Sequence, residues 1–268
     1  MKLNKIHVII ASILFFVVGY FTSSSVIEIV SAVSGLLCVW LAAKEHIWNY
    51  PIGFINIAAF MYVFWGAGLY ADFTLQIIFA VLGVYGWIYW LKGKGNKSVK
   101  PTKRVTTSEI ILYIVIAIVG TFLWANVNLR IFNGVALPYF DAFVAVLSVI
   151  AQVMLSRKRL ENWYVWILVD VLSVGMYWYK DLHLVSLLYV FFLVNAVYGL
   201  IAWKKEYERF QLEQMIDKMI EIDDRMREGA EIIGNALKTP WVKFVEEHQK
   251  AYYTTDDPEN PFNKGEKL

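Results

Sequence analysis

The chain contains two copies of one segment, residues 26–91 and 139–204, which align without a gap at a constant separation of 113 residues, as from Asn49 to Asn162. Coinciding Leu, Val and Ile are expected in any apolar chain. Here rarer types also coincide, including Trp, Asn, Gly and acidic residues. Each copy holds three apolar stretches, so the chain is a tandem repeat of a three-segment unit.

The apolar stretches are long enough to cross a membrane. Hydrophobic residues make up 58% of the 268 residues and charged residues 18%, and a helix needs roughly 20 apolar residues to cross a hydrocarbon core of about 30 Å. A cleavable signal peptide is the alternative for the first span, but no A-x-A cleavage pattern follows it. We predict eight spans, near 6–22, 26–43, 50–67, 73–91, 108–126, 140–155, 161–179 and 183–203.

Basic residues predict the orientation of these spans. Residues 92–104 hold six cations and no anion, which places this loop in the cytoplasm by the positive-inside rule. Lys44, residues 157–159 and residues 204–205 fall on the same side, whereas residues 23–28 contain no Lys or Arg. Both termini are therefore predicted to be cytoplasmic.

The predicted fold class is all-α: a polytopic membrane protein with a 3+1+3 parallel repeat of transmembrane helices, an extra N-terminal helix and a cytoplasmic helical tail. One connector span between the copies makes them parallel. Transporters built from repeats bind their solute between the copies, near the middle of the membrane. The predicted parts are residues 1–25 (first helix), 26–91 (first repeat), 92–138 (basic loop and connector), 139–204 (second repeat) and 205–268 (tail).

Polar residues inside spans are candidates for a solute site, because a polar group in hydrocarbon is costly unless it is satisfied. Asp170 is the most costly, at about 2.5–3.5 kcal/mol. Trp163, Trp166 and Asp170 share one helical face, and Tyr177 continues it. Indoles and a carboxylate suit a flat cationic ring, and side-chain amides suit a carboxamide or hydroxyl groups. The predicted site residues are Asn56, Gln76, Trp163, Trp166, Asp170, Tyr177 and Asn195.

These assignments have structural alternatives. Gln76 and Asn195 can instead form hydrogen bonds between helices. Glu28 and Asp141 each begin the first helix of a copy, where capping and the helix dipole explain an acidic residue better than attraction of a cation does. Tryptophan gathers at membrane interfaces, and we predict that position for Trp48, Trp65, Trp87, Trp90, Trp178 and Trp203.

Enzyme and metal chemistry find no support in the sequence. The four histidines are scattered without ligand spacing, and Cys38 is the single cysteine. The Gly-Lys-rich stretch at residues 93–97 lacks the spacing of a phosphate-binding loop. We therefore predict no catalytic activity, no cofactor and no metal.

Both copies resemble the PnuC family of vitamin transporters, over about residues 26–205. The similarity lies in residues 35–50, 53–56, 69–72, 75–76 and 85–87 of the first copy, and in residues 146–148, 157–163 and 166 of the second. It implies facilitated diffusion of nicotinamide riboside across the bacterial inner (cytoplasmic) membrane for NAD biosynthesis. It also implies a homotrimer and a separate cytoplasmic kinase that traps the riboside. The partners would then be a small vitamin and membrane lipid, with no nucleic acid.

The sequence leaves two alternatives to a nicotinamide riboside transporter. Nicotinamide riboside members of the family can have Asn where this chain has Asp170, and a carboxylate can favour thiamine, another cationic aromatic vitamin carried by relatives of the same fold. A membrane sensor that binds a vitamin and signals through its tail is the other alternative.

The sequence of the tail, residues 205–268, predicts a short amphipathic helix followed by a second one. Gly229, Gly234 and Pro240 weaken or interrupt the first helix, the second ends near Tyr253, and residues 256–261 are predicted to be disordered. Apolar residues at alternating spacings of three and four form the seam of a coiled coil or the lipid-facing side of a surface helix. These residues are Leu212, Met215, Met219, Ile222 and Met226.

Overall fold

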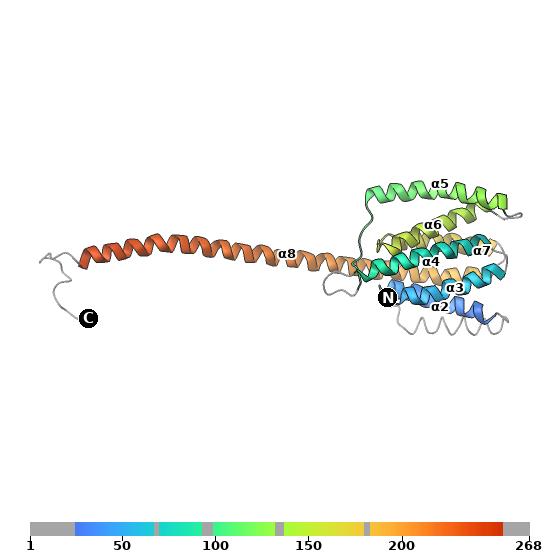
Figure 1. The fold of residues 1–268 in the computed structure, drawn as a ribbon, viewed down its shortest axis with the longest axis horizontal. Coiled ribbons are helices and arrows are strands. Elements are labelled where there is room, and N and C mark those ends of the chain that lie inside the picture. Colours follow the sequence, from blue (N-terminus) through green and yellow to red (C-terminus); the bar gives the residue numbers. More distant parts are fainter. Residues whose placement is uncertain (1–24, 67–69, 93–98, 132–136, 180–182, 254–268) are drawn as a thin grey trace. The chain divides into compact units, whose positions relative to one another are not determined.

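The computed structural model describes residues 25–66, 70–92, 99–131, 137–179 and 183–253, so the predicted first span and residues 256–261 lie outside its described part. The chain divides into two compact units, Met1–Phe210 and Gln211–Leu268. Within the described ranges there are seven α-helices and no named β-strand (Figure 1). They are α2 (Val26–Ala43), α3 (Asn49–Gly66), α4 (Tyr70–Leu91), α5 (Thr107–Ile131), α6 (Pro138–Ser156), α7 (Asn162–Tyr179) and α8 (His183–Tyr253).

Each predicted span that falls in the described residues is helical. The helices α2, α4, α5 and α6 and part of α8 are long and apolar enough to cross a membrane. α3 and α7 have 18 residues each but carry more aromatic and polar side chains. The all-helical fold is thus confirmed for the described residues, and these helices have the length and composition that the predicted membrane class requires.

The same local structure follows the first helix of each repeat. The caps of α2 and α6 have nearly identical backbone angles at Lys44 and Arg157, and the next residues, Glu45 and Lys158, have φ of 55° and 56°. The side-chain amides of the repeated asparagines at positions 49 and 162 donate to backbone carbonyls three residues earlier, at 2.8 and 2.6 Å. These asparagines therefore hold the short connections between helices.

The two repeats meet through close helix packing. α4 of the first repeat packs against α6 of the second, and α5 packs along α6. Glycine is required at two repeated positions. A Cβ atom on Gly86 would lie 2.5 Å from the Tyr50 hydroxyl, and one on Gly199 would lie 2.6 Å from the ring of Trp163.

The tryptophan prediction was wrong for Trp90 and Trp203, whose side chains are completely buried. The Trp90 indole N–H donates to the Leu155 carbonyl at 3.1 Å, and that of Trp203 donates to the Ala42 carbonyl at 3.0 Å. A buried indole N–H needs such an acceptor, and each finds it at the end of the other repeat's first helix. Other tryptophans stay well exposed, namely Trp48, Trp65 and Trp178.

The acidic residue Glu28 caps α2, as predicted. Its carboxylate accepts from the Ser25 backbone N–H at 3.0 Å, and its own N–H donates to the Ser25 hydroxyl at 3.3 Å. This reciprocal pair is a capping box, which satisfies two N–H groups at a helix start.

The prediction of two tail helices was wrong. α8 continues without a break to Tyr253 and includes Pro240. Ion pairs one turn apart join Glu221 to Arg225 and Asp223 to Arg227, and such pairs support an exposed helix. Together with strong helix-forming residues, they outweigh the cost of the interior glycines and proline. Within the tail unit, the apolar seam residues remain exposed.

Candidate functional site

The centre of α7 buries a carboxylate. Asp170 is 3% exposed, and Ser173, one helical turn later, is fully buried. Within the described part of the chain, the Asp170 carboxylate has no ion pair or hydrogen bond. A buried charge without a partner is strongly unfavourable. None of the described residues supplies such a partner, so the position is a candidate for contact with a solute.

Aromatic rings from α7 and α8 lie beside this carboxylate. Tyr177 stacks on Tyr189, with ring centroids 5.1 Å apart and an angle of 20° between the planes. Tyr189 meets Phe192 edge to face at 5.8 Å. Asp170 is close enough to act electrostatically on the Tyr189 phenol. These rings offer flat surfaces next to a negative charge.

Phe192 connects this group to the first repeat. A Cβ atom on Gly35 of α2 would lie 3.6 Å from the Phe192 ring and 3.0 Å from the amide nitrogen of Asn56. That nitrogen donates to the Ser31 carbonyl at 2.6 Å. Asn56 thus joins α3 to α2, directly beside the point where α8 of the second repeat approaches.

Two further predicted residues, Gln76 and Asn195, carry buried amides at 8% and 7% exposure. Asn195 donates to the Phe191 carbonyl of its own helix at 3.0 Å, and its Oδ1 is buried without a partner. Gln76 makes no side-chain hydrogen bond among the described residues. Unsatisfied amides of this kind can bind the carboxamide or hydroxyl groups of a solute.

The two predicted indoles pack with other residues. Trp163 is 2% exposed and meets Trp203 edge to face at 5.5 Å. Trp166 packs against the cluster formed by Val144, Leu147 and Val169. The structure therefore places Asp170 and Tyr177 close to Tyr189, and Trp163 in a tryptophan cluster at the other end of α7.

The electrostatic surroundings of the tyrosine pair are acidic. Three carboxylates act on the phenols: Asp72 and Asp141 on Tyr177, and Asp72 and Asp170 on Tyr189. Such surroundings favour a positively charged solute and disfavour a phosphate group.

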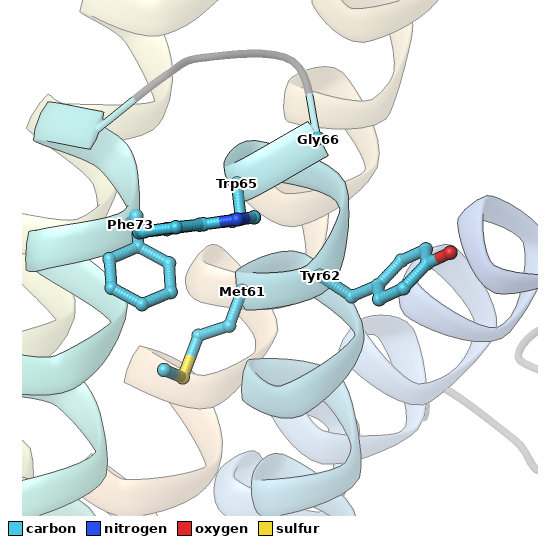
Figure 2. Close-up of a pocket in the computed structure, with 5 residues that line it drawn as sticks. All are labelled: Met61, Tyr62, Trp65, Gly66 and Phe73. Carbon is cyan, nitrogen blue, oxygen red and sulfur yellow. The ribbon is translucent and has the colours of Figure 1, made fainter.

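A separate cavity of about 430 Å³ lies where α3 ends and α4 begins (Figure 2). Trp65 and Phe73 face each other there, with ring centroids 5.2 Å apart. The lining is apolar and contains none of the predicted site residues. Its polar groups are those of Tyr62 and Trp65, and it contains no charged side chain or side-chain amide. Its lining residues are Met61, Tyr62, Trp65, Gly66 and Phe73.

Helices of membrane-spanning length around buried polar groups are typical of polytopic membrane proteins that carry polar solutes. A family model described as nicotinamide mononucleotide transporter matches residues 25–205. The chain therefore belongs to this family, the PnuC family of vitamin transporters.

Several relatives are similar to this chain over most of their length. The nicotinamide riboside transporter PnuC of Neisseria mucosa is 31% identical over 72% of this chain and 77% of the relative. Its counterpart in Escherichia coli is 28% identical over 66% of this chain and 84% of the relative. The riboflavin/roseoflavin transporter RibM of Streptomyces davaonensis is 24% identical over 66% and 83%. A crystal structure of the vitamin B3 transporter PnuC superposes with a TM-score of 0.64 at 29% identity, covering 75% of this chain and 90% of that one.

Sequence reasoning missed Ser173, Tyr189 and Phe192 as neighbours of the predicted site. Serine and aromatic residues are common in membrane helices, so their type alone carried no signal. Their position in the repeat did carry a signal, because Tyr189 of the second repeat corresponds to Gln76 of the first. A polar residue and an aromatic residue at equivalent positions indicate that the two repeats present different groups at one interface.

Proposed function

We propose that this chain is a facilitative transporter of nicotinamide riboside. The observation that carries the proposal is the buried carboxylate of Asp170, unpaired among the described residues and close to the stacked rings of Tyr177 and Tyr189. Nicotinamide riboside has a cationic aromatic ring, a carboxamide and ribose hydroxyls. The ring suits the carboxylate and the tyrosines, and the amides of Gln76 and Asn195 suit its polar groups.

The names of the relatives support the same substrate, since those of Neisseria mucosa and Escherichia coli are called nicotinamide riboside transporters. The family description names the mononucleotide. The acidic surroundings of the tyrosine pair argue against a phosphate, so we favour the riboside.

The proposed arrangement is two parallel three-helix repeats in the inner membrane, with the basic loop and the tail in the cytoplasm. Two observations support the repeat. The helices α3 and α7 begin and end at equivalent positions, and the backbone has the same φ at residues 45 and 158. The basic loop and the positive-inside rule support the orientation. Uptake then follows the concentration gradient, maintained by a cytoplasmic kinase that phosphorylates the riboside for NAD synthesis. We propose a homotrimer in which each protomer has its own path.

The second candidate is thiamine, because Asp170 places a carboxyl group at the site, where it can pair with a cationic ring. Thiamine carries a cationic thiazolium ring and a second aromatic ring but no ribose. It would use the carboxylate and the tyrosines while leaving the amides of Gln76 and Asn195 less well satisfied.

Calorimetry on the purified protein in detergent tests the substrate. We expect binding of nicotinamide riboside at micromolar affinity, about −8 kcal/mol, and much weaker binding of thiamine, riboflavin and nicotinamide mononucleotide. A preference for thiamine would leave the site in place and replace the substrate. Binding of none of the four would contradict the proposed function.

Removal of residues 211–268 separates transport from sensing. We expect the truncated protein to take up nicotinamide riboside in proteoliposomes at the rate of the full chain, because the candidate site lies wholly within the first unit. The measurement is initial uptake at matched protein density. A protein that binds the riboside but carries none, with or without the tail, would instead be a sensor.

A further inference from the structure

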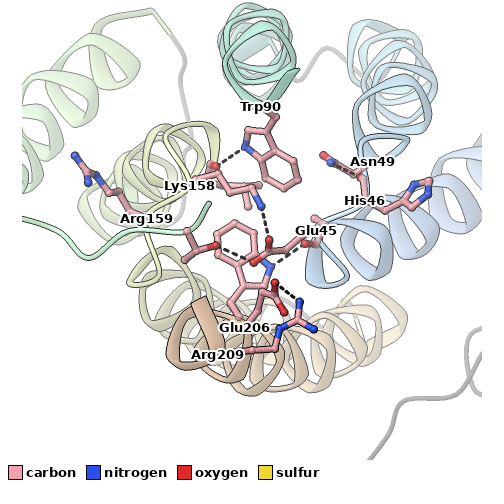
Figure 3. A network of polar contacts seen from close by, with 12 residues as sticks. Glu45, His46, Asn49, Trp90, Lys158, Arg159, Glu206 and Arg209 are labelled. Atoms are coloured by element: carbon pink, nitrogen blue, oxygen red, sulfur yellow. Dashed lines mark hydrogen bonds and ion pairs between the residues drawn. The ribbon is translucent and has the colours of Figure 1, made fainter. Parts of the chain in front are cut away.

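An ion pair joins the two repeats at one end of the bundle, which we call the basic end because it includes residues 99–106 and 157–161. Lys158 Nζ lies 2.7 Å from Glu45 Oε2, and the Lys158 side chain is completely buried although its partner is 14% exposed (Figure 3). The two residues occupy equivalent positions, 113 residues apart. The contact therefore crosses between the repeats at their equivalent loops.

Two tryptophans enclose the ammonium group. Lys158 Nζ lies 4.2 Å from the centre of the Trp90 ring and 4.9 Å from that of Trp203, within the range of a cation–π contact. These are the same indoles whose N–H groups bond to the opposite repeat. The ion pair and both rings thus fill the space between the repeats at this end.

The basic loop runs across the same place. Thr102 Oγ1 donates to Glu45 Oε1 at 2.7 Å, and Lys103 exchanges backbone hydrogen bonds with the connection between α6 and α7, at 2.9 and 2.8 Å. Arg104 pairs with Glu161, which raises the pKa of that guanidinium. Both carboxylate oxygens of Glu45 therefore accept a hydrogen bond, one from Thr102 of the basic loop and one from Lys158 of the second repeat.

We propose that Glu45 and Lys158 form the inner closure of the transport path and must separate each time solute leaves at the basic end. The buried residues around Asp170 lie farther along α7, so a solute held there reaches the basic end only by passing between the repeats. Both charged residues sit on loops between helices, so their separation leaves each three-helix unit intact. Interfaces of this kind have discrete closed and open arrangements.

The pair is suited to reversible closure because its charges are nearly removed from water when closed and become hydrated when apart. A buried ion pair contributes little net stability, since desolvation offsets the attraction. The closed and open arrangements can therefore have similar free energies. An apolar plug of the same size would favour the closed arrangement more strongly.

Thiol labelling tests the closure without any substrate. The background is Cys38→Ala, which removes the single cysteine, and the reporter is Ser173→Cys, at a fully buried position near Asp170. An impermeant thiol reagent is applied from the basic side. We expect Glu45→Gln to raise the labelling rate about tenfold or more, because one partner of the buried pair is lost. Labelling at the parent rate would overturn the proposal.

A charge exchange provides the rescue. In the double variant Glu45→Lys with Lys158→Glu, the cation moves to the equivalent position of the other repeat, which has the same backbone conformation, and the carboxylate takes its former place. We expect labelling to return close to the parent rate. Continued fast labelling would show that Glu45→Gln acted through a general loss of structure and would count against the closure. The matched control is Glu221→Gln, which removes one partner of an exposed pair in the tail and should leave labelling unchanged.

Crosslinking gives a second measurement, which does not depend on whether the Glu45→Gln variant folds. With Glu45→Cys and Lys158→Cys in the Cys38→Ala background, joining the thiols with a short bis-maleimide should lower uptake of nicotinamide riboside about tenfold or more while calorimetric binding persists. Crosslinking Glu221→Cys to Arg225→Cys in the tail is the control. Undiminished uptake through the crosslinked protein would overturn the closure. This second test rests on the proposed substrate, whereas the labelling test does not. A wrong substrate can therefore be distinguished from a wrong assignment of the closure.

Discussion

Replacing Asp170 with asparagine is expected to lower the affinity for nicotinamide riboside by about ten- to a hundredfold, or about 1.5–3 kcal/mol. The carboxylate is buried and has no partner among the described residues, so its charge is available to a cationic ring in a medium of low dielectric constant. Asparagine keeps the size and the hydrogen-bonding ability but removes the charge. Calorimetry on the purified variant measures the effect.

The reduced riboside, whose ring is uncharged, separates the charge from the shape of the site. The parent protein should bind the oxidised riboside more tightly than the reduced form, and Asp170→Asn should remove most of that difference. An equal loss for both ligands would mean that Asp170 supports the structure instead of the solute. The matched control is Asp217→Asn, the same substitution on the exposed tail, which should bind like the parent.

Replacing Trp203 with alanine is expected to destabilise the bundle by roughly 3–5 kcal/mol, as for other buried aromatic residues. The side chain is completely buried, meets the rings of Trp90 and Trp163, and donates to the Ala42 carbonyl at 3.0 Å. Its loss leaves a cavity at the meeting point of the repeats and removes one of two donors to the Ala42 carbonyl, which still accepts from the Glu45 N–H at 2.9 Å. Thermal unfolding in detergent should show a lower midpoint.

The control for this prediction is Trp48→Ala, at an exposed tryptophan of the same bundle, which should change stability by about 0.5 kcal/mol or less. Trp203→Phe is the finer variant, since it keeps an aromatic ring and removes only the N–H donor and part of the volume. An unfolding midpoint for Trp203→Ala equal to that of Trp48→Ala would contradict the role assigned to the tryptophan.

The repeat explains why so much of the scaffold could be predicted. Residues that hold the scaffold occur in both copies, such as Asn49 with Asn162 and Gly86 with Gly199, because each copy must solve the same packing problem. Residues proposed for the solute are not repeated: Asp170 corresponds to Ile57, and Asn195 to Leu82. One asymmetric solute between two similar halves requires different groups from each, so a difference between the copies points to the site.

The sequence was a poorer guide to individual tryptophans. Trp90 and Trp203 end apolar helices beside basic residues, as interfacial tryptophans also do, and residue type does not separate the two cases. Their burial depends on which carbonyls and which cation lie opposite in the folded chain. Trp163 shows the same effect, because its helical face is shared with Asp170 yet its ring packs on Trp203.

By itself, the sequence determined that the chain is a helical membrane protein of the PnuC family with two similar segments of three apolar stretches each, because apolar length and sequence similarity depend only on the order of residues. The tertiary structure alone decided which side chains meet across the repeats. The stacking of Tyr177 on Tyr189 and the pairing of Glu45 with Lys158 join residues from different helices. Such contacts depend on how helices rotate and pack against each other, and helical periodicity within one segment carries no information about the facing segment.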